Sequence, residues 1–170
     1  MISAEIIAVG SELLTPSFVD TNSMYLTRQL NELGIPVVIK IIVGDDEPYL
    51  EHALRGSLER SPVTIVTGGL GPTEDDVTKK VVGRVLQRQL VLNDAILAGI
   101  EKRFKARGVE MPRNNARQAL ILTGSDVLEN KNGTAPGLWI STDRNHGPRS
   151  AGARRENSRL DHCPGRVRSP

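Results

Sequence analysis

Cysteine is almost absent from this sequence of 170 residues, aromatic side chains make up only 3%, and no long apolar run occurs. The single cysteine, Cys163, excludes an intrachain disulfide and any zinc site built from several cysteines. Because aromatic residues are so few, the core must be aliphatic. The apolar runs fall short of the roughly 18 residues of a transmembrane helix, and the first residues lack the basic start of a signal peptide. We expect one cytoplasmic domain, since domains usually have roughly 100–200 residues.

The net charge of +2 is unevenly distributed. Residues 145–170 contain six arginines and two carboxylates, a net charge of +4, which leaves −2 for residues 1–144. The basic pI therefore comes from the last residues, and the globular part gives no reason to expect nucleic-acid binding. The Arg, Gly, Pro and Ser content of residues 145–170 predicts a tail that is disordered or out of frame, with no apolar face to bury.

Strand and helix signals alternate through the first 143 residues. The predicted strands are Ala4–Val9, Val37–Val43 and Val63–Thr67, followed by shorter ones at Leu120–Leu122, Val127–Leu128 and Leu138–Ile140. The predicted helices are Thr21–Leu33, 48–58, Glu74–Leu86 and one from the cap Asn93 to Arg107. This alternation favours an α/β fold with a mostly parallel sheet and helices on both faces, and such sheets bind ligands at the carboxyl ends of their strands.

A glycine-rich segment, Thr67-Gly-Gly-Leu-Gly-Pro-Thr-Glu-Asp-Asp-Val-Thr78, connects a predicted strand to a helix. Glycines allow close backbone approach to a ligand, and unpaired N–H groups at a helix start attract phosphate. The segment is neither a P-loop nor a Rossmann fingerprint, because both patterns are incomplete. The alternative interpretation is ordinary helix capping, with Thr73 as the N-cap and Asp76 as its partner.

Two acidic clusters, Asp45-Asp46-Glu47 and Glu74-Asp75-Asp76, follow predicted parallel strands and therefore share one sheet edge. Beside a phosphate loop they would repel an anionic ligand, unless a cation such as Mg²⁺ bridges carboxylates and phosphates. Gly10-Ser11-Glu12 follows the first strand at the same edge, and Gly133–Gly137 is a further loop able to wrap a ligand. The alternative for each acid is a solvated position at a helix start.

These segments together resemble the N-terminal domain of the CinA family (competence/damage-inducible protein A), a branch of the MoaB/Mog molybdopterin-binding fold. The resemblance covers residues 1 to about 143. The matching segments are Ala4-Glu-Ile-Ile-Ala-Val-Gly-Ser-Glu-Leu-Leu14, Asp20-Thr-Asn22, Val43-Gly-Asp-Asp46, the segment from Thr67 to Thr78, Asn114-Asn-x-x-Gln-Ala119 and Gly133-Thr-Ala-Pro-Gly137.

The resemblance implies a three-layer α/β/α fold with a ligand site at the strand ends. In Mog-type relatives the Thr-Gly-Gly-x-Gly loop binds the pterin phosphate, and two aspartates support Mg²⁺-dependent adenylyl chemistry. By motif position these are Asp45 and Asp76, which we expect to be catalytic and to hold a divalent metal together with Asp75. The residues expected to bind the substrate or its phosphate are Gly10, Ser11, Glu12, Thr67, Gly68, Gly69, Gly71, Pro72, Thr73, Thr78, Gly133, Thr134, Pro136 and Gly137.

In CinA proteins this domain is associated with metal-dependent hydrolysis of the ADP-ribose pyrophosphate bond, which is the leading functional prediction. The alternatives are adenylyl transfer to molybdopterin, a non-catalytic module that binds a pterin or nucleotide, and an inactive truncated remnant. The expected partners are small phosphate-bearing molecules, with no nucleic acid and no membrane, and the family analogy implies a homo-oligomer.

Two departures from the family pattern limit these expectations. The chain ends before the nicotinamide-nucleotide amidase domain that full-length CinA proteins usually carry, so that activity is not expected. After Asp143-Arg144-Asn145 the family's apolar strand and Pro-Gly-Pro-Pro loop are replaced by Arg-rich sequence. We therefore place a MoaB/Mog-like domain, incomplete at its C-terminal end, at residues 1–144.

Overall fold

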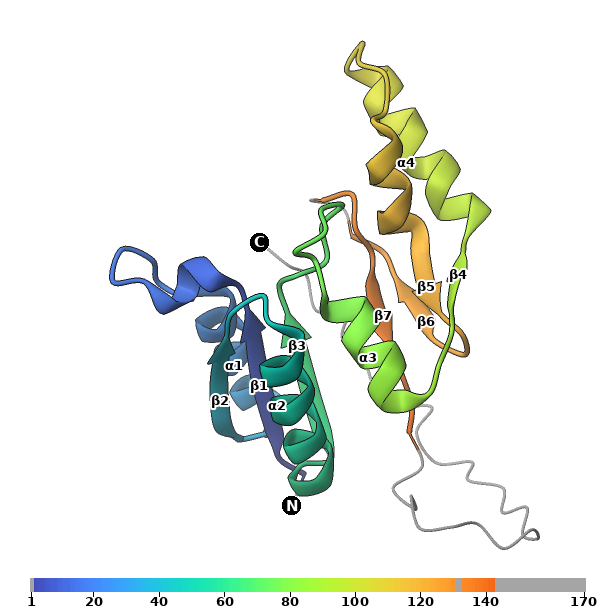
Figure 1. The fold of residues 1–170 in the computed structure, drawn as a ribbon. Helices are drawn as coiled ribbons and strands as arrows, with labels where there is room; N and C mark the ends of the chain where they lie inside the picture. Colours follow the sequence, from blue (N-terminus) through green and yellow to red (C-terminus); the bar gives the residue numbers. More distant parts are fainter. Residues whose placement is uncertain (1, 131–132, 143–170) are drawn as a thin grey trace, which may run out of the picture.

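The computed structural model describes residues 2–130 and 133–142 (Figure 1). The predicted tail at 145–170 and its boundary at residue 144 lie outside them. The elements are β1 (Ala4–Val9), η1 (Ser11–Leu14), α1 (Thr21–Glu32), β2 (Val37–Val43), α2 (Glu47–Arg60), β3 (Val63–Thr67), α3 (Thr78–Leu86), β4 (Leu90–Leu92), α4 (Asp94–Ala106), η2 (Arg113–Ala119), β5 (Leu120–Leu122), β6 (Asp126–Leu128) and β7 (Gly137–Trp139), where η marks a 3₁₀-helix.

The central sheet is parallel, with the strand order β2-β1-β3. Every residue of β1 is buried, because this strand has neighbours on both sides and helices on both faces. Figure 1 shows α1 behind the sheet and α2 in front of it. The predicted α/β fold with three layers is therefore confirmed.

Two aliphatic clusters hold the layers together. On one face Ala4 and Ile6 of β1 pack with Leu30 of α1. On the other face Ile7 and Val9 pack with Leu50 and Leu54 of α2, with Val81 of α3 and with Val77, which precedes α3. Alternate side chains of β1 thus pack on opposite faces of the sheet, as expected for a strand.

A buried carboxylate, Glu5 of β1, fixes α2 to the sheet. Glu5 is only 1% exposed, and it accepts hydrogen bonds from Ser57 Oγ at 2.7 Å and from Arg60 Nη2 at 2.8 Å. Burial alone would raise the pKa of Glu5, but the hydrogen bonds from Arg60 and Ser57 hold it below its ordinary value. The side chain is therefore a charged structural anchor.

The four later strands do not extend the parallel sheet. They form two antiparallel pairs, β4 with β5 and β6 with β7. Figure 1 places α3 between these pairs and the parallel sheet. β4 was not predicted from the sequence. Within the described residues, no helix combines the length and apolar character needed to cross a membrane.

The helix predicted at Glu74–Leu86 begins four residues later, at Thr78. The Asp76 carboxylate accepts hydrogen bonds from backbone N–H groups of the preceding turn, and these bonds compete with helix formation. The interpretation of Thr73 as the N-cap is therefore wrong. Val77 occupies the N-cap position, and no side chain caps the helix there. Asn93, in contrast, caps α4 as predicted, accepting from Ile96 N at 3.1 Å.

Candidate functional site

The loops that follow β1, β2 and β3 lie side by side at one edge of the sheet. The Gly10 N–H donates to Val43 O at 2.9 Å, which joins the ends of β1 and β2. Gly68 has φ +93°, and a Cβ at this position would lie 2.0 Å from the carbonyl oxygen of Val9. Only glycine permits this approach of β3 to β1. The parallel order thus brings three predicted site segments together.

Ser11 and Asp45 connect two of these loops. Ser11 N donates to Asp45 Oδ2 at 2.9 Å, and Asp45 N donates to Ser11 Oγ at 3.1 Å. The hydroxyl of Ser11 is therefore engaged as an acceptor by the protein backbone. No hydrogen bond within the described residues occupies the other carboxylate oxygen of Asp45.

Asp76 organises the glycine-rich loop from within. Its carboxylate accepts from Gly71 N and Thr73 N, both at 2.7 Å, and from Thr73 Oγ1 at 2.6 Å. Burial would raise the pKa of Asp76, but the hydrogen bonds of Thr73 and Gly71 and the charge of Arg117 hold it below its ordinary value. Asp76 is therefore ionised and shapes the turn around residues 71–76.

Thr78 closes the same loop onto the start of α3. Its hydroxyl donates to Gly68 O at 2.8 Å, and its N–H donates to Gly69 O at 3.2 Å. Gly69 has φ +58°, and a Cβ there would lie 2.5 Å from the Thr78 hydroxyl. Thr67 ends β3 in a half-buried position, while Pro72 is half-buried and Thr73 is exposed.

The carboxylates predicted to hold a metal do not form a preformed cage. No group of three or more His, Cys, Asp or Glu side chains that could hold a metal ion occurs in the part of the chain that the structure describes. Asp75 is exposed, and both oxygens of Asp76 already accept hydrogen bonds. The open oxygen of Asp45 fits the way Mg²⁺ is held by one or two carboxylates plus ligand phosphates.

The structure places the predicted Gly133–Gly137 loop against α4. Arg103 of α4 donates to the carbonyl oxygens of Gly133 and Asn130. The Asn130 side chain donates to Ala135 O at 2.9 Å and accepts from Gly133 N. Pro136 is buried, and Thr134 and Gly137 are half-buried. These contacts connect the loop to α4, and none of them connects it to the glycine-rich loop.

Two groups beside the loop were not predicted. Lys79 is 8% exposed, and its Nζ donates to the carbonyl oxygens of Gln118 and Leu120, both at 2.9 Å. Burial lowers the pKa of Lys79 to about 8, against the opposing charge of Asp76. Arg117 of η2 pairs with Glu74. A Lys-Lys pair at a helix start ordinarily indicates an exposed face, so no local pattern indicates that Lys79 is buried.

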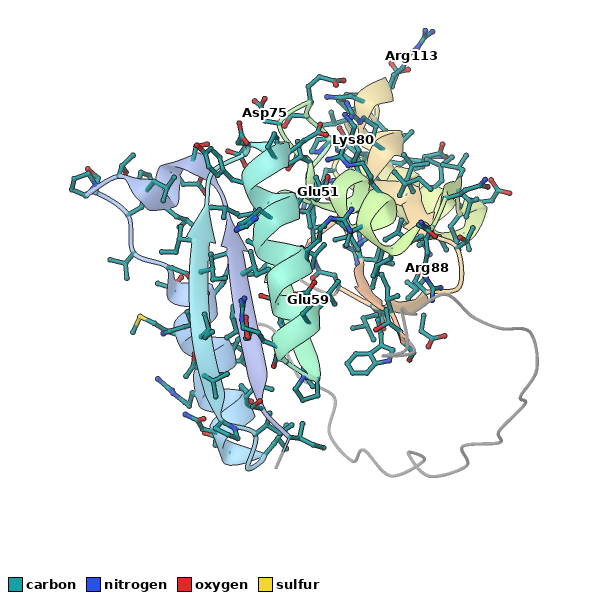
Figure 2. All side chains as sticks on the ribbon, turned by 60° about the horizontal axis from the view of Figure 1, so that its bottom comes forward. Glu51, Glu59, Asp75, Lys80, Arg88 and Arg113 are labelled. Carbon is teal, nitrogen blue, oxygen red and sulfur yellow. The ribbon has the colours of Figure 1, made fainter. Side chains whose placement is uncertain are left out.

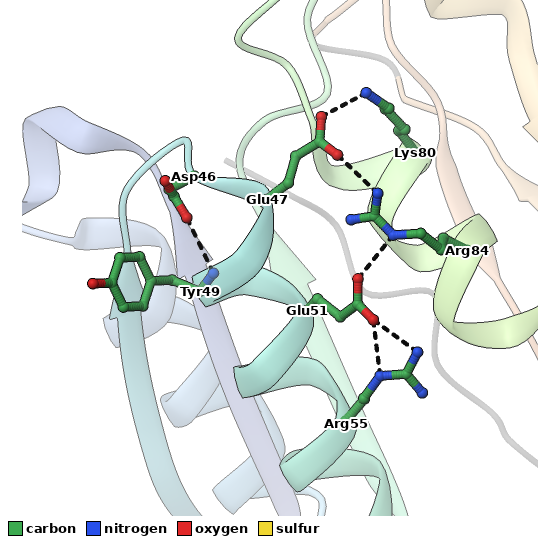
Figure 3. A network of polar contacts seen from close by, with 7 residues as sticks. All are labelled: Asp46, Glu47, Tyr49, Glu51, Arg55, Lys80 and Arg84. Carbon is green, nitrogen blue, oxygen red and sulfur yellow. Dashed lines mark hydrogen bonds and ion pairs between the residues drawn. The ribbon is translucent and has the colours of Figure 1, made fainter.

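Ion pairs join α3 to α2 (Figure 3). They thereby help to position the loops that precede these two helices. Glu47 accepts from Lys80 Nζ at 2.6 Å and from Arg84 Nη1 at 3.0 Å. Glu51 accepts from Arg84 Nε and from Arg55 Nη2, both at 2.8 Å. The hydrogen bonds from Lys80 and Arg84 lower the pKa of Glu47. Figure 2 shows Asp75 and Lys80 at the same end of the molecule, away from Glu59.

Comparisons with known sequences identify the family of the chain. Residues 5–149 match the family model described as a probable molybdopterin binding domain. A CinA-like protein of Solibacter usitatus is 52% identical over 137 residues, which are 81% of this chain and 33% of that protein. A CinA-like protein of Koribacter versatilis is 47% identical over 146 residues, 86% of this chain and 35% of that protein. The chain thus spans about a third of the length of these relatives.

Solved structures show the same fold. The crystal structure of CinA from Thermoplasma acidophilum, a protein of unknown function, has a TM-score of 0.75 and 31% identity, and the match covers 84% of this chain and 83% of that one. MoaB from Thermus thermophilus has a TM-score of 0.50 and 20% identity, with 72% and 79% covered, which shows the fold alone. The chain belongs to the probable molybdopterin binding domain family, as a relative of the CinA-like proteins.

Proposed function

We propose that the edge formed by the ends of β1, β2 and β3 binds the phosphate groups of a pterin or nucleotide ligand. The observation that carries this proposal is the joint placement of the Gly68–Thr78 loop and the Ser11–Asp45 pair at that edge. Ligands of open parallel sheets bind at the carboxyl ends of strands. The backbone N–H groups of Gly68 and Gly69 are the donors assigned to the phosphate, because their positive φ angles form a turn without side chains.

The reaction we assign to this site is cleavage of the pyrophosphate bond of ADP-ribose-like nucleotides. Water adds to one phosphorus while the bridging P–O bond breaks, which yields AMP, ribose 5-phosphate and protons. A bound Mg²⁺ would neutralise phosphate charge, and we assign Asp45 to hold it because one oxygen of its carboxylate accepts no hydrogen bond from the described residues. Asp76 maintains the loop in which the phosphate is positioned, which is the main requirement of phosphoryl chemistry.

Adenylyl transfer to molybdopterin is the second candidate. The match to a probable molybdopterin binding domain favours it. The greater similarity of the chain to CinA-like proteins, 52% identity against 20% to MoaB, favours the hydrolase. Both candidates use the same loop, so their products distinguish them.

Phosphorus NMR on ADP-ribose with Mg²⁺ tests the reaction. The purified chain should release AMP and ribose 5-phosphate, and Asp45→Asn should reduce the rate on the order of 10²-fold, because charge stabilisation at a reacting centre is a large effect. Asp94→Asn, an exposed aspartate at the start of α4, is the control with the same charge change. Adenylylated pterin formed from ATP, with no cleavage of ADP-ribose, would favour the transferase. Binding of ADP-ribose without formation of either product would indicate a non-catalytic binding module.

A further inference from the structure

A groove of ≈ 600 Å³ runs between α1 and β2, apart from the strand ends that form the candidate site. Five of its lining residues come from α1 and one, Lys40, comes from β2. Those of α1 are Met24, Thr27, Arg28, Asn31 and Glu32. Figure 1 shows β2 at the outer edge of the parallel sheet. The groove therefore combines a helix face with an edge strand.

The outer side of β2 has no strand neighbour among the described residues. The pairing with β1 skips Val38 and is then regular from Ile39 to Val43. Alternate residues of this regular stretch direct N–H and C=O groups away from β1, where another strand can accept and donate hydrogen bonds. A regular edge of this length is a template for an added strand.

The apolar side of α1 reaches β2 at Val37. Leu26 and Leu30 of α1 pack in the cluster that contains Ala4 and Ile6 of β1, and Val37 packs against the same cluster. Met24 of α1 is 58% exposed, and Val38 and Ile42 of β2 are 57% and 42% exposed. These three apolar side chains of α1 and β2 are therefore exposed in the described part of the chain.

The charge of the groove is positive. Arg28 and Lys40 line it, and neither forms an ion pair with any described residue. The only carboxylate of the lining, Glu32, accepts a hydrogen bond from Gln29 at 3.1 Å. The lining therefore holds two cations and one carboxylate, and this excess of positive charge complements an acidic segment.

We propose that an extended acidic segment of a partner protein adds to β2 as a strand, with carboxylates on Arg28 and Lys40 and an apolar side chain against Met24. A second copy of this chain fits the same edge poorly. In the antiparallel pairing that aligns two full β2 strands, Lys40 is the central residue and lies opposite its equivalent. Like charges directly opposite each other destabilise such a pair.

Fluorescence anisotropy with labelled octapeptides tests the proposal. The probes are an alternating Glu-Val peptide, its Lys-Val counterpart, and the Glu-Val peptide with every second amide N-methylated. The Glu-Val probe should bind saturably. Arg28→Glu with Lys40→Glu should weaken it about tenfold and favour the Lys-Val probe, because two attractions become repulsions. N-methylation of the edge that pairs with β2 should abolish binding, because it removes the donors.

The double variant Lys102→Glu with Lys105→Glu is the matched control, since both residues are exposed on α4 and the net charge changes equally. It should bind the Glu-Val probe like the unmodified chain. Equal weakening in both double variants would reduce the effect to net charge and overturn the proposal. Absence of saturable binding, or indifference to N-methylation, would do the same. A sedimenting dimer that competes with the probe would assign the edge to a second copy instead.

Discussion

Ser11 and Asp45 exchange two hydrogen bonds, Ser11 N to Asp45 Oδ2 at 2.9 Å and Asp45 N to Ser11 Oγ at 3.1 Å. The pair joins the loops after β1 and β2, which are 34 residues apart in the sequence. The two bonds orient the Asp45 carboxylate at the sheet edge, where the glycine-rich loop follows β3. The geometry of the proposed site therefore depends on the contact between the loops after β1 and β2 as well as on the glycine-rich loop.

Replacing Ser11 by alanine should loosen the orientation of Asp45. The Asp45 N–H loses its acceptor, while the bond from Ser11 N to the carboxylate can remain. We expect the affinity for ADP-ribose with Mg²⁺ to fall roughly fivefold, the equivalent of one hydrogen bond. Titration calorimetry measures this change. Ser17→Ala, at an exposed position of the same region, should bind like the unmodified chain, and an equal loss there would refute the role of Ser11.

Replacing Asp76 by asparagine should open the turn at residues 71–76. In the wild-type chain the two carboxylate oxygens accept hydrogen bonds from the N–H groups of Gly71 and Thr73. Asparagine has an NH₂ group in place of one oxygen, so at least one of these N–H groups loses its acceptor. We expect the free energy of unfolding to fall by about 1–3 kcal/mol. Urea unfolding gives this value. Asp75→Asn, an exposed neighbour with the same charge change, is the control and should have little effect. Equal losses in both variants would contradict the account.

Much of this architecture could be predicted from the sequence. Every residue of Ala4–Val9 except Glu5 is aliphatic, and this composition predicts the burial that the strand shows. Gly34 and Gly108 directly follow two of the predicted helices and have φ +73° and φ +69°. Pro48 lies in the first turn of α2, as its fixed φ favours. Each of these signals is local, so neighbouring residues alone determine it.

The errors arose where side chains compete with the backbone or act across the fold. The segment Glu74–Val77 looks helical by composition, but the hydrogen bonds of Asp76 hold it as a turn. The burial of Lys79 depends on carbonyl groups about 40 residues away, which no local pattern reveals. The roles of Asp45, Asp75 and Asp76 as metal or catalytic residues stay predictions.

Substitution of Gly68 by alanine should disrupt the junction of β3 and β1. The residue has φ +93°, and the new Cβ would collide with the backbone oxygen of Val9, which cannot rotate away. Strain of roughly 1–3 kcal/mol is expected from the backbone conformation alone. Gly99→Ala is the matched control, because it lies in α4 with no atom within 4 Å of the new Cβ. Differential scanning calorimetry should show a lower Tm for Gly68→Ala and an unchanged or higher Tm for Gly99→Ala.

The buried Glu5 predicts a pH-dependent effect of Ser57→Ala. Removing a hydroxyl that donates to a buried carboxylate should cost about 1.5–3 kcal/mol at neutral pH. The folded-state pKa of Glu5 is below its ordinary value of 4.5, so its stabilisation is present above that value and is lost as the pH falls through the folded pKa. The difference between the two proteins should therefore narrow in acid. A constant difference from pH 7 to pH 3 would show that Ser57 acts without Glu5.

A titration of the ¹⁵N-labelled chain with ADP-ribose and Mg²⁺, followed by backbone amide NMR, tests directly whether the ligand binds at the ends of β1, β2 and β3. We expect saturable shifts for Ser11, Asp45 and the Gly68–Thr78 amides, and smaller changes in the groove between α1 and β2. We also expect Asp76→Asn to remove these shifts while the remaining resonances stay those of the folded chain. Saturable shifts confined to other surfaces, or no shifts at millimolar ligand, would contradict a phosphate site at this edge of the sheet.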